Sequence, residues 1–117
     1  MNSYILCDKC YRDGEAKATL FDKIRKRDRL CVYCHKELKE LHHAVGTPSD
    51  KATVEHMDDN SVKNPEEWNV AMCCGSCNSS RGAKKLPDWF KSKYCTEKNI
   101  NESTVSEVVR NYMNRIK

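Results

Sequence analysis

The chain has 117 residues, the length of one domain, and its composition narrows the classes of protein to which it can belong. Hydrophobic residues make up 38% of the chain and charged residues 32%, so the apolar core is small and a large enzyme with a deep apolar pocket is excluded. The formal net charge is +4, and no apolar run is long enough to span a membrane.

The pattern of apolar and turn-forming residues predicts a small α+β fold. A helix is favoured where Leu20, Phe21 and Ile24 share one face, and alternation of polar and apolar residues predicts short strands later in the chain. The predicted elements, in chain order, are a helix over 15–29, a strand or knuckle over 30–33, a loop over 44–50, a strand over 52–56, a polar loop or helical turn over 57–67 and a strand over 70–72.

The C-terminal part of the chain predicts an amphipathic helix, because apolar residues recur there at helical spacing. Thr104 and Glu107 have the spacing of a capping box, which would begin this helix. Its apolar face would consist of Val105, Val108, Val109, Tyr112 and Ile116. No repeat or linker divides the chain, so we expect one domain: an N-terminal extension over 1–14, a core over 15–95 and a C-terminal helical segment over 96–117.

Cysteine is abundant, with eight residues in the chain. The first ten residues, MNSYILCDKC, lack the basic start and apolar run of a secretory signal, so we expect a cytoplasmic, reducing location. In that setting, cysteines at regular spacing predict metal binding rather than disulfides.

Two matched pairs predict a structural zinc site. Each pair leaves a two-residue gap, which allows both sulfur atoms of a knuckle to reach one ion, and two knuckles complete a tetrahedral site. The predicted ligands are Cys31, Cys34, Cys74 and Cys77. Cys73 could replace Cys74 in the second pair, but only Cys74 leaves a two-residue gap before Cys77.

A third pair, Cys7 and Cys10, has no matching fourth pair. A second zinc site would need one of several other residues, and the alternative is that both remain reduced thiols. The candidates that could complete such a site are Cys73, Cys95, His35, His42 and His43.

Residues 23–90 resemble the HNH endonuclease family. The resemblance rests on motifs that stand in the family's order: Arg27-Asp28 before the first CxxC pair, Glu55-His56 after a predicted strand, Asn69 ahead of the second pair, Asn78 directly after it, and then Gly82, Lys84 and Leu86-Pro87. The resemblance implies a ββα-metal (His-Me finger) core stapled by the four-cysteine zinc site, with flanking helices.

The resemblance also implies roles for four residues. His56 matches the general base, and Glu55 and Asn78 match ligands of a catalytic Mg²⁺ or Mn²⁺ ion. Asn69 matches the Asn that braces the loop next to the base. Many members have Asp where this chain has Glu55, and the extra methylene changes the reach of the carboxylate.

These roles suit hydrolysis of a phosphodiester bond. A neutral imidazole can take a proton from water near neutral pH, and a hard divalent cation neutralises charge at phosphorus. Arg81, Lys84 and Lys85 are the predicted phosphate contacts. Trp68 and Trp89 could stack on bases, although packing in the core is favoured for both.

We therefore expect a metal-dependent DNA endonuclease that nicks one strand as a monomer, or cuts both as a homodimer, with no membrane association. No separate sequence-reading domain is visible, so a larger protein partner could supply specificity. The alternative is a non-catalytic zinc-bound module that binds nucleic acid, in which Glu55, His56 and Asn78 are incidental.

Overall fold

The computed structural model describes residues 14–39 and 48–116 of the chain. In order, its elements are α2 (Gly14–Arg27), the 3-10 turn η1 (Pro48–Asp50), β1 (Ala52–His56), α3 (Asn60–Lys63), β2 (Val70–Cys74), α4 (Gly75–Arg81), α5 (Leu86–Trp89), α6 (Lys93–Lys98) and α7 (Glu107–Ile116). The predicted α+β class is confirmed. Among the described residues, no helix has the length and apolar character needed to cross a lipid bilayer.

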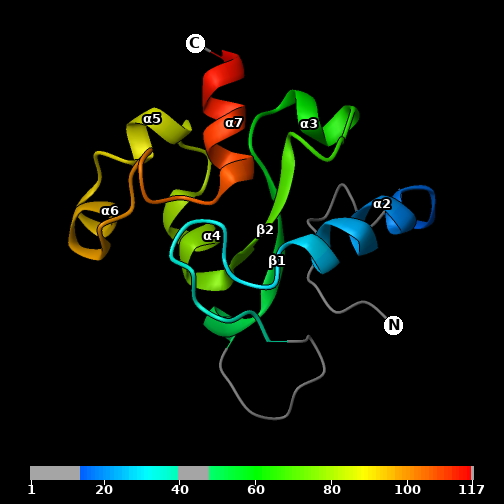
Figure 1. The fold of residues 1–117 in the computed structure, drawn as a ribbon, viewed down its shortest axis with the longest axis horizontal. Coiled ribbons are helices and arrows are strands. Elements are labelled where there is room, and N and C mark those ends of the chain that lie inside the picture. Colours follow the sequence, from blue (N-terminus) through cyan, green and yellow to red (C-terminus); the bar gives the residue numbers. More distant parts are fainter. Residues whose placement is uncertain (1–13, 40–47, 117) are drawn as a thin grey trace.

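An antiparallel hairpin of β1 and β2 forms the centre of the fold, with α2 and α4 on opposite sides of it (Figure 1). Its register runs from Ala52 opposite Cys74 at one end to His56 opposite Val70 at the other. The sequence predicts both strands, and β2 extends two residues beyond the predicted end at Met72.

The outer edge of β2 is covered by the segment that follows α2. The backbone N–H of Met72 donates to Asp28 at 2.9 Å, and the Met72 carbonyl accepts from the N–H of Val32 at 3.2 Å. Arg27 holds the Asp28 carboxylate with two hydrogen bonds of 2.8 Å. A covered edge leaves no free row of backbone groups to pair with another chain.

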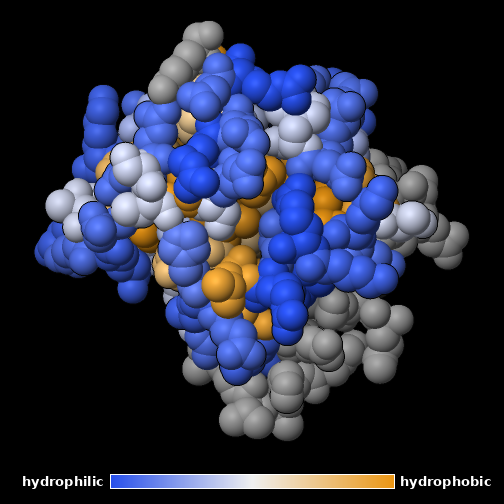
Figure 2. Space-filling view, viewed as in Figure 1, coloured by the Kyte–Doolittle hydropathy of each residue, from blue (hydrophilic) through white to orange (hydrophobic). Residues whose placement is uncertain are grey.

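The core lies on both faces of the hairpin. Phe21 and Ile24 of α2 are buried, as their helical spacing predicts, and Trp89 of α5 is fully buried. Trp89 packs edge-on against Tyr33, with ring centroids 4.8 Å apart, so the core interpretation of this tryptophan is confirmed. The face of the molecule drawn in Figure 2 is mostly hydrophilic, with hydrophobic side chains in small patches only.

The C-terminal helix begins later than predicted. Thr104 does not cap it, because its hydroxyl accepts from the N–H of Asn101 and donates to the Asn101 carbonyl, so the capping-box prediction is wrong. Helix α7 begins at Glu107, and Val105 is buried ahead of it. The loop hydrogen bonds give Thr104 an alternative to capping, which short polar side chains readily accept.

Helix α7 packs on the connection between the two strands. The Tyr112 hydroxyl donates to Asp58 at 2.9 Å, and the Tyr112 ring stacks on Trp68 with centroids 6.1 Å apart. The Arg115 guanidinium lies 4.0 Å from the centroid of the Trp68 ring. Trp68 is therefore covered by α7, which favours the packing interpretation over stacking on a base.

Candidate metal centre and candidate active site

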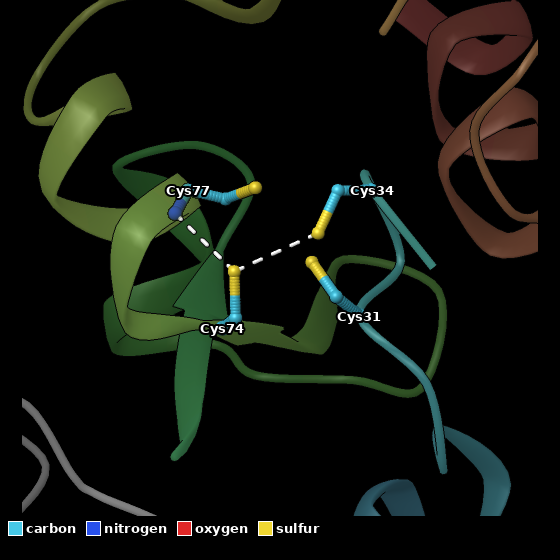
Figure 3. Close-up of side chains that lie close together, drawn as sticks. All are labelled: Cys31, Cys34, Cys74 and Cys77. Carbon is cyan, nitrogen blue, oxygen red and sulfur yellow. Dashed lines mark hydrogen bonds between the residues drawn. The ribbon is translucent and has the colours of Figure 1, made fainter. Parts of the chain in front are cut away.

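Four cysteines meet at the end of the hairpin where Ala52 faces Cys74. Their sulfur atoms all lie within 4.8 Å of one another and point toward a common centre (Figure 3). The Sγ atoms of Cys34 and Cys74 are 3.7 Å apart. Four thiolates at the usual Zn–S distance of about 2.3 Å would be about 3.8 Å apart, so the residues present fit a tetrahedral zinc ion.

The first knuckle is a tight turn directly after α2. Its two ligands are Cys31 and Cys34, and the turn closes through a hydrogen bond from the N–H of His35 to the Cys31 carbonyl at 3.0 Å. His35 has a φ of 64°, in the left-handed region that non-glycine residues seldom adopt. This backbone geometry turns the chain so that both sulfur atoms face the same side.

The second knuckle joins the end of β2 to the first turn of α4. Cys74 caps the helix, and its sulfur accepts from the N–H of Cys77 at 3.4 Å. The hydroxyl of Tyr94 lies 3.3 Å from the Cys77 sulfur. A hydrogen-bond donor at a helix N-terminus favours the thiolate form of Cys74, which is the form that binds metal.

The thiols of the cluster share protons unequally. Hydrogen bonding from Cys31 lowers the pKa of Cys74 to about 6, and the same neighbour lowers the pKa of Cys34. Hydrogen bonds within the cluster raise the pKa of Cys31, with Cys34 as the main cause, and of Cys77, with Cys31 as the main cause. The cluster therefore gathers negative charge on part of its sulfur atoms, and a divalent cation would neutralise it.

The choice of Cys74 over Cys73 is confirmed. Cys73 is buried beside Thr53, with its sulfur 3.4 Å from the Thr53 hydroxyl, and it is not part of the cluster. Cys95 is buried in α6. Residues 1–13 and 40–47, which contain the third pair and two of the histidines suggested for a second zinc site, lie outside the described residues.

At the other end of the hairpin, Glu55 is engaged within the protein. Its side chain faces α4, and the residue is only 5% exposed. The Oε2 atom accepts a 2.7 Å hydrogen bond from the Tyr33 hydroxyl and lies 3.1 Å from Nη1 of Arg81. Burial raises the pKa of the Glu55 carboxyl, and the charge of Arg81 opposes that shift.

Arg81 is buried, whereas the sequence predicts that it contacts phosphate. The residue is 6% exposed, and its guanidinium donates to the carbonyls of His56 at 3.0 Å and Met57 at 2.9 Å. Nε donates to the Lys84 carbonyl at 2.9 Å. These contacts hold Arg81 in the interior, so of the three predicted phosphate contacts only Lys84 and Lys85 are exposed.

His56 is the last residue of β1 and is half-buried. Its ring lies edge-on to Phe21 of α2, with centroids 6.4 Å apart. Because neighbouring strand residues point to opposite faces, His56 faces α2 while Glu55 faces α4. The structure therefore does not bring these two adjacent side chains to one centre.

Asn78 lies on α4, and Asn69 lies in the turn directly before β2. Asn78, on α4, donates from its amide to the Thr53 hydroxyl of β1 at 3.0 Å. Asn69 is fully buried; its side chain accepts from the N–H of Glu66 at 2.7 Å and donates to the Asn64 carbonyl at 3.1 Å. Asn69 thus braces the loop that leads back from β1 to β2.

Glu55 does not fit as a ligand of a second, hydrated cation in this arrangement. The carboxylate of Glu55 is occupied by Tyr33 and Arg81, and the guanidinium places a positive charge where a cation would approach. Among the residues that the structure describes, the cysteine cluster is the only group of three or more His, Cys, Asp or Glu close enough to share a metal ion.

Sequence reasoning missed Tyr33 and Tyr94, which contact the two sites. Tyr33 lies inside the first CxxC pair, and it is fully buried with a hydroxyl that needs a partner. That partner is a carboxylate 22 residues further along the chain, which no local pattern signals. Tyr94 lies 17 residues beyond Cys77 and likewise carries no spacing signal.

Comparison of the chain with protein-family models, with curated proteins and with solved structures returned no match.

Proposed function

We propose that the protein is a metal-dependent DNA endonuclease of the HNH type, in which His56 is the general base. The observation that carries the proposal is the arrangement around the hairpin. His56 ends β1, Asn69 braces the loop that precedes β2, and Asn78 lies on α4 directly after the second knuckle. This order of strand, strand and helix supports the ββα-metal core that the resemblance implies.

In this proposal the chain's own residues perform three tasks. His56 accepts a proton from the water that attacks phosphorus, while the bond from phosphorus to the 3′ oxygen breaks and that oxygen takes a proton from solvent, which leaves 5′-phosphate and 3′-hydroxyl ends. The exposed Lys84 and Lys85, just after α4, bind phosphate groups on either side of the scissile bond. Asn69 keeps the loop after β1 in one conformation, so that the base does not move relative to the bound strand.

A Zn²⁺ ion in the cysteine cluster has a structural task in the proposal, because four protein ligands leave no open position for a substrate. Mg²⁺ or Mn²⁺ would supply charge neutralisation at phosphorus when bound. Of the two ligands that the resemblance implies for it, Glu55 is committed to Arg81 in the described arrangement.

A non-catalytic, zinc-bound nucleic-acid-binding module is the second candidate. The specific observation that favours it is the ion pair between Glu55 and Arg81, since an occupied carboxylate has no role in recruiting a catalytic cation. In that case Lys84 and Lys85 would bind nucleic acid and His56 would be a packing residue beside Phe21.

A plasmid-nicking assay separates the two. Zinc-loaded protein is incubated with supercoiled plasmid in Mg²⁺ or Mn²⁺, then with EDTA, then with the metal restored. We expect nicked circles that disappear with EDTA and return with the metal, at a rate proportional to protein concentration if a monomer nicks. Retardation of the plasmid without any nicking, in either metal, would contradict the endonuclease and support the binding module.

A further inference from the structure

We propose that Glu55 and Arg81 form a buried positioning pair that fixes the end of β1, and that Glu55 is not a ligand of a catalytic cation. The pair itself is independent of the proposed function. The further claim that the pair orients the base rests on the proposed function. Melting temperatures test the pair, and nicking kinetics test the function.

The first observation is the number of backbone groups that Arg81 satisfies. It donates to carbonyls at three points: His56 and Met57, where β1 ends, and Lys84, beyond the end of α4. Buried carbonyls without a partner are strongly unfavourable. Arg81 therefore ties the last residue of the strand to the helix that crosses it, and no neutral side chain offers as many donors in this fork geometry.

The second observation is that the charge of Arg81 is compensated at the same place. The side chains of Arg81 and Glu55 are 8% and 7% exposed, and a lone buried charge is far less favourable than a paired one. The Tyr33 hydroxyl donates to the same carboxylate oxygen, at 2.7 Å. The carboxylate thus has two donors of its own and acts as the counterion that allows Arg81 to be buried.

The third observation is the length of the Glu55 side chain. Glu55 extends from the penultimate residue of β1 across to the last residue of α4 and to Tyr33 in the first knuckle. An Asp at this position would be shorter by one methylene and would withdraw the carboxylate from both donors. The positioning pair therefore accounts for Glu at a position where the resemblance leads one to expect Asp.

Because the His56 carbonyl is one of the groups that Arg81 holds, the pair restrains the backbone that carries the proposed base. Glu55 and Arg81 are positioning residues in this account, and neither touches the substrate. A displacement of about 1 Å at a reacting group can lower a rate roughly 100-fold, so loss of the pair should reduce kcat more than it changes KM.

The experiment is a double-mutant cycle on the full-length, zinc-loaded chain, with Glu55→Gln, Arg81→Gln and the double variant, together with Glu55→Asp. Glu97→Gln is the control, since it removes one partner of the exposed Lys93–Glu97 ion pair on α6. The melting temperature and the Mn²⁺ affinity by calorimetry are measured for each protein, and nicking kinetics for those that fold.

We expect Arg81→Gln to lower the melting temperature most and the double variant to melt above it, because the second change removes the unpaired buried carboxylate. Glu55→Asp should also melt below wild type, and Glu97→Gln should not. Mn²⁺ affinity in Glu55→Gln should stay within about a factor of two of wild type. If Arg81→Gln does not fold and the double variant does, the same conclusion follows.

Several results would overturn the proposal. One is a tenfold or greater loss of Mn²⁺ affinity in Glu55→Gln; another is Glu55→Asp with wild-type melting; a third is a double variant that melts as low as the sum of the single changes predicts. If wild type nicks no plasmid while the melting temperatures show coupling, the endonuclease proposal is contradicted and the positioning pair is supported. If wild type nicks and the melting changes are additive, the pair fails and the endonuclease stands.

Discussion

Each end of the β1–β2 hairpin carries one candidate site, and the two sites differ in how closely their side chains converge. At the Ala52–Cys74 end, four side chains of one chemistry converge within 4.8 Å of one another. At the His56–Val70 end, the residues of the proposed active site separate: Glu55 faces α4 and pairs with Arg81, while His56 faces α2.

The difference reflects how each set of residues is specified. Thiolates at two-residue spacing have few other partners in the interior, so the spacing itself determines the cluster. Carboxylate, imidazole and amide groups accept many partners, and which one they meet depends on residues far away in the chain. Local spacing therefore specifies the cysteine cluster more completely than it specifies the residues at the other end. Substitutions at the two ends test this difference.

The largest expected effect is the loss of the cysteine cluster. Cys77→Ser removes one ligand and should leave the protein unfolded or insoluble, because structural zinc contributes roughly 10–16 kcal/mol of apparent binding free energy and the core is small. Zinc content and circular dichroism measure this. Cys95→Ser is the matched control, since Cys95 is buried outside the cluster and should keep one zinc per chain. A folded, metal-free Cys77→Ser protein with wild-type melting would contradict the zinc site.

The next largest effect tests the other end of the hairpin. His56→Ala should keep its zinc and its affinity for DNA while nicking falls by about 10²–10⁴-fold, the usual contribution of a general base. The wild-type rate should rise with pH through one apparent pKa, and the variant should lack that rise. Undiminished nicking by carefully purified His56→Ala protein would remove the histidine from catalysis and favour the nucleic-acid-binding module.

Acid should release the zinc, because protons compete with the metal for thiolates. Without metal, hydrogen bonding from Cys31 lowers the folded pKa of Cys74 from its ordinary value of 9.0 to about 6, so the stabilisation of the metal-free protein by this thiolate is complete above 9.0 and is lost as pH falls through about 6. A chromogenic chelator should report little free zinc near pH 8 and a rising amount toward pH 5. Release that does not depend on pH over this range would contradict a thiolate site.

The smallest expected effect concerns binding of nucleic acid. Replacing Lys84 and Lys85 with Ala should weaken binding to all sequences alike and reduce the slope of log affinity against log salt by roughly one for each lysine. Fluorescence anisotropy at several salt concentrations measures this slope. Lys98→Ala, on α6, provides the control. An unchanged slope in the double variant would show that these lysines do not touch phosphate.

Much of the fold is readable from local pattern. The strand over 52–56 is confirmed with the predicted bounds, and the helix that buries Phe21 and Ile24 is confirmed within two residues at its C-terminal end. Segment 75–85 is too polar and irregular for periodicity to reveal α4. That helix is specified by its caps, because the Cys74 sulfur accepts from the orphan N–H of Cys77 and Gly82, at a φ of 54°, ends the helix.

The candidate active site was less predictable because its partners come from distant parts of the chain. Arg81 follows the motif's last Asn by three residues, which suggests an exposed helical position next to the substrate. Its actual surroundings are set by the His56 and Met57 carbonyls, some 25 residues earlier, and by Glu55. A charge buried by tertiary contacts cannot be recognised from spacing on one helix.

The distance in sequence between the two knuckles has a separate consequence. Cys34 and Cys74 are 40 residues apart, so a zinc ion bound by both would close a long loop. The entropy of closing a loop grows only with the logarithm of its length, and doubling the length costs about 0.6 kcal/mol. The chain between the knuckles can therefore be lengthened at positions outside the hairpin with little thermodynamic effect, provided that the ion holds the ends together. A zinc-stapled hairpin of this kind is a tolerant host for inserted peptide segments.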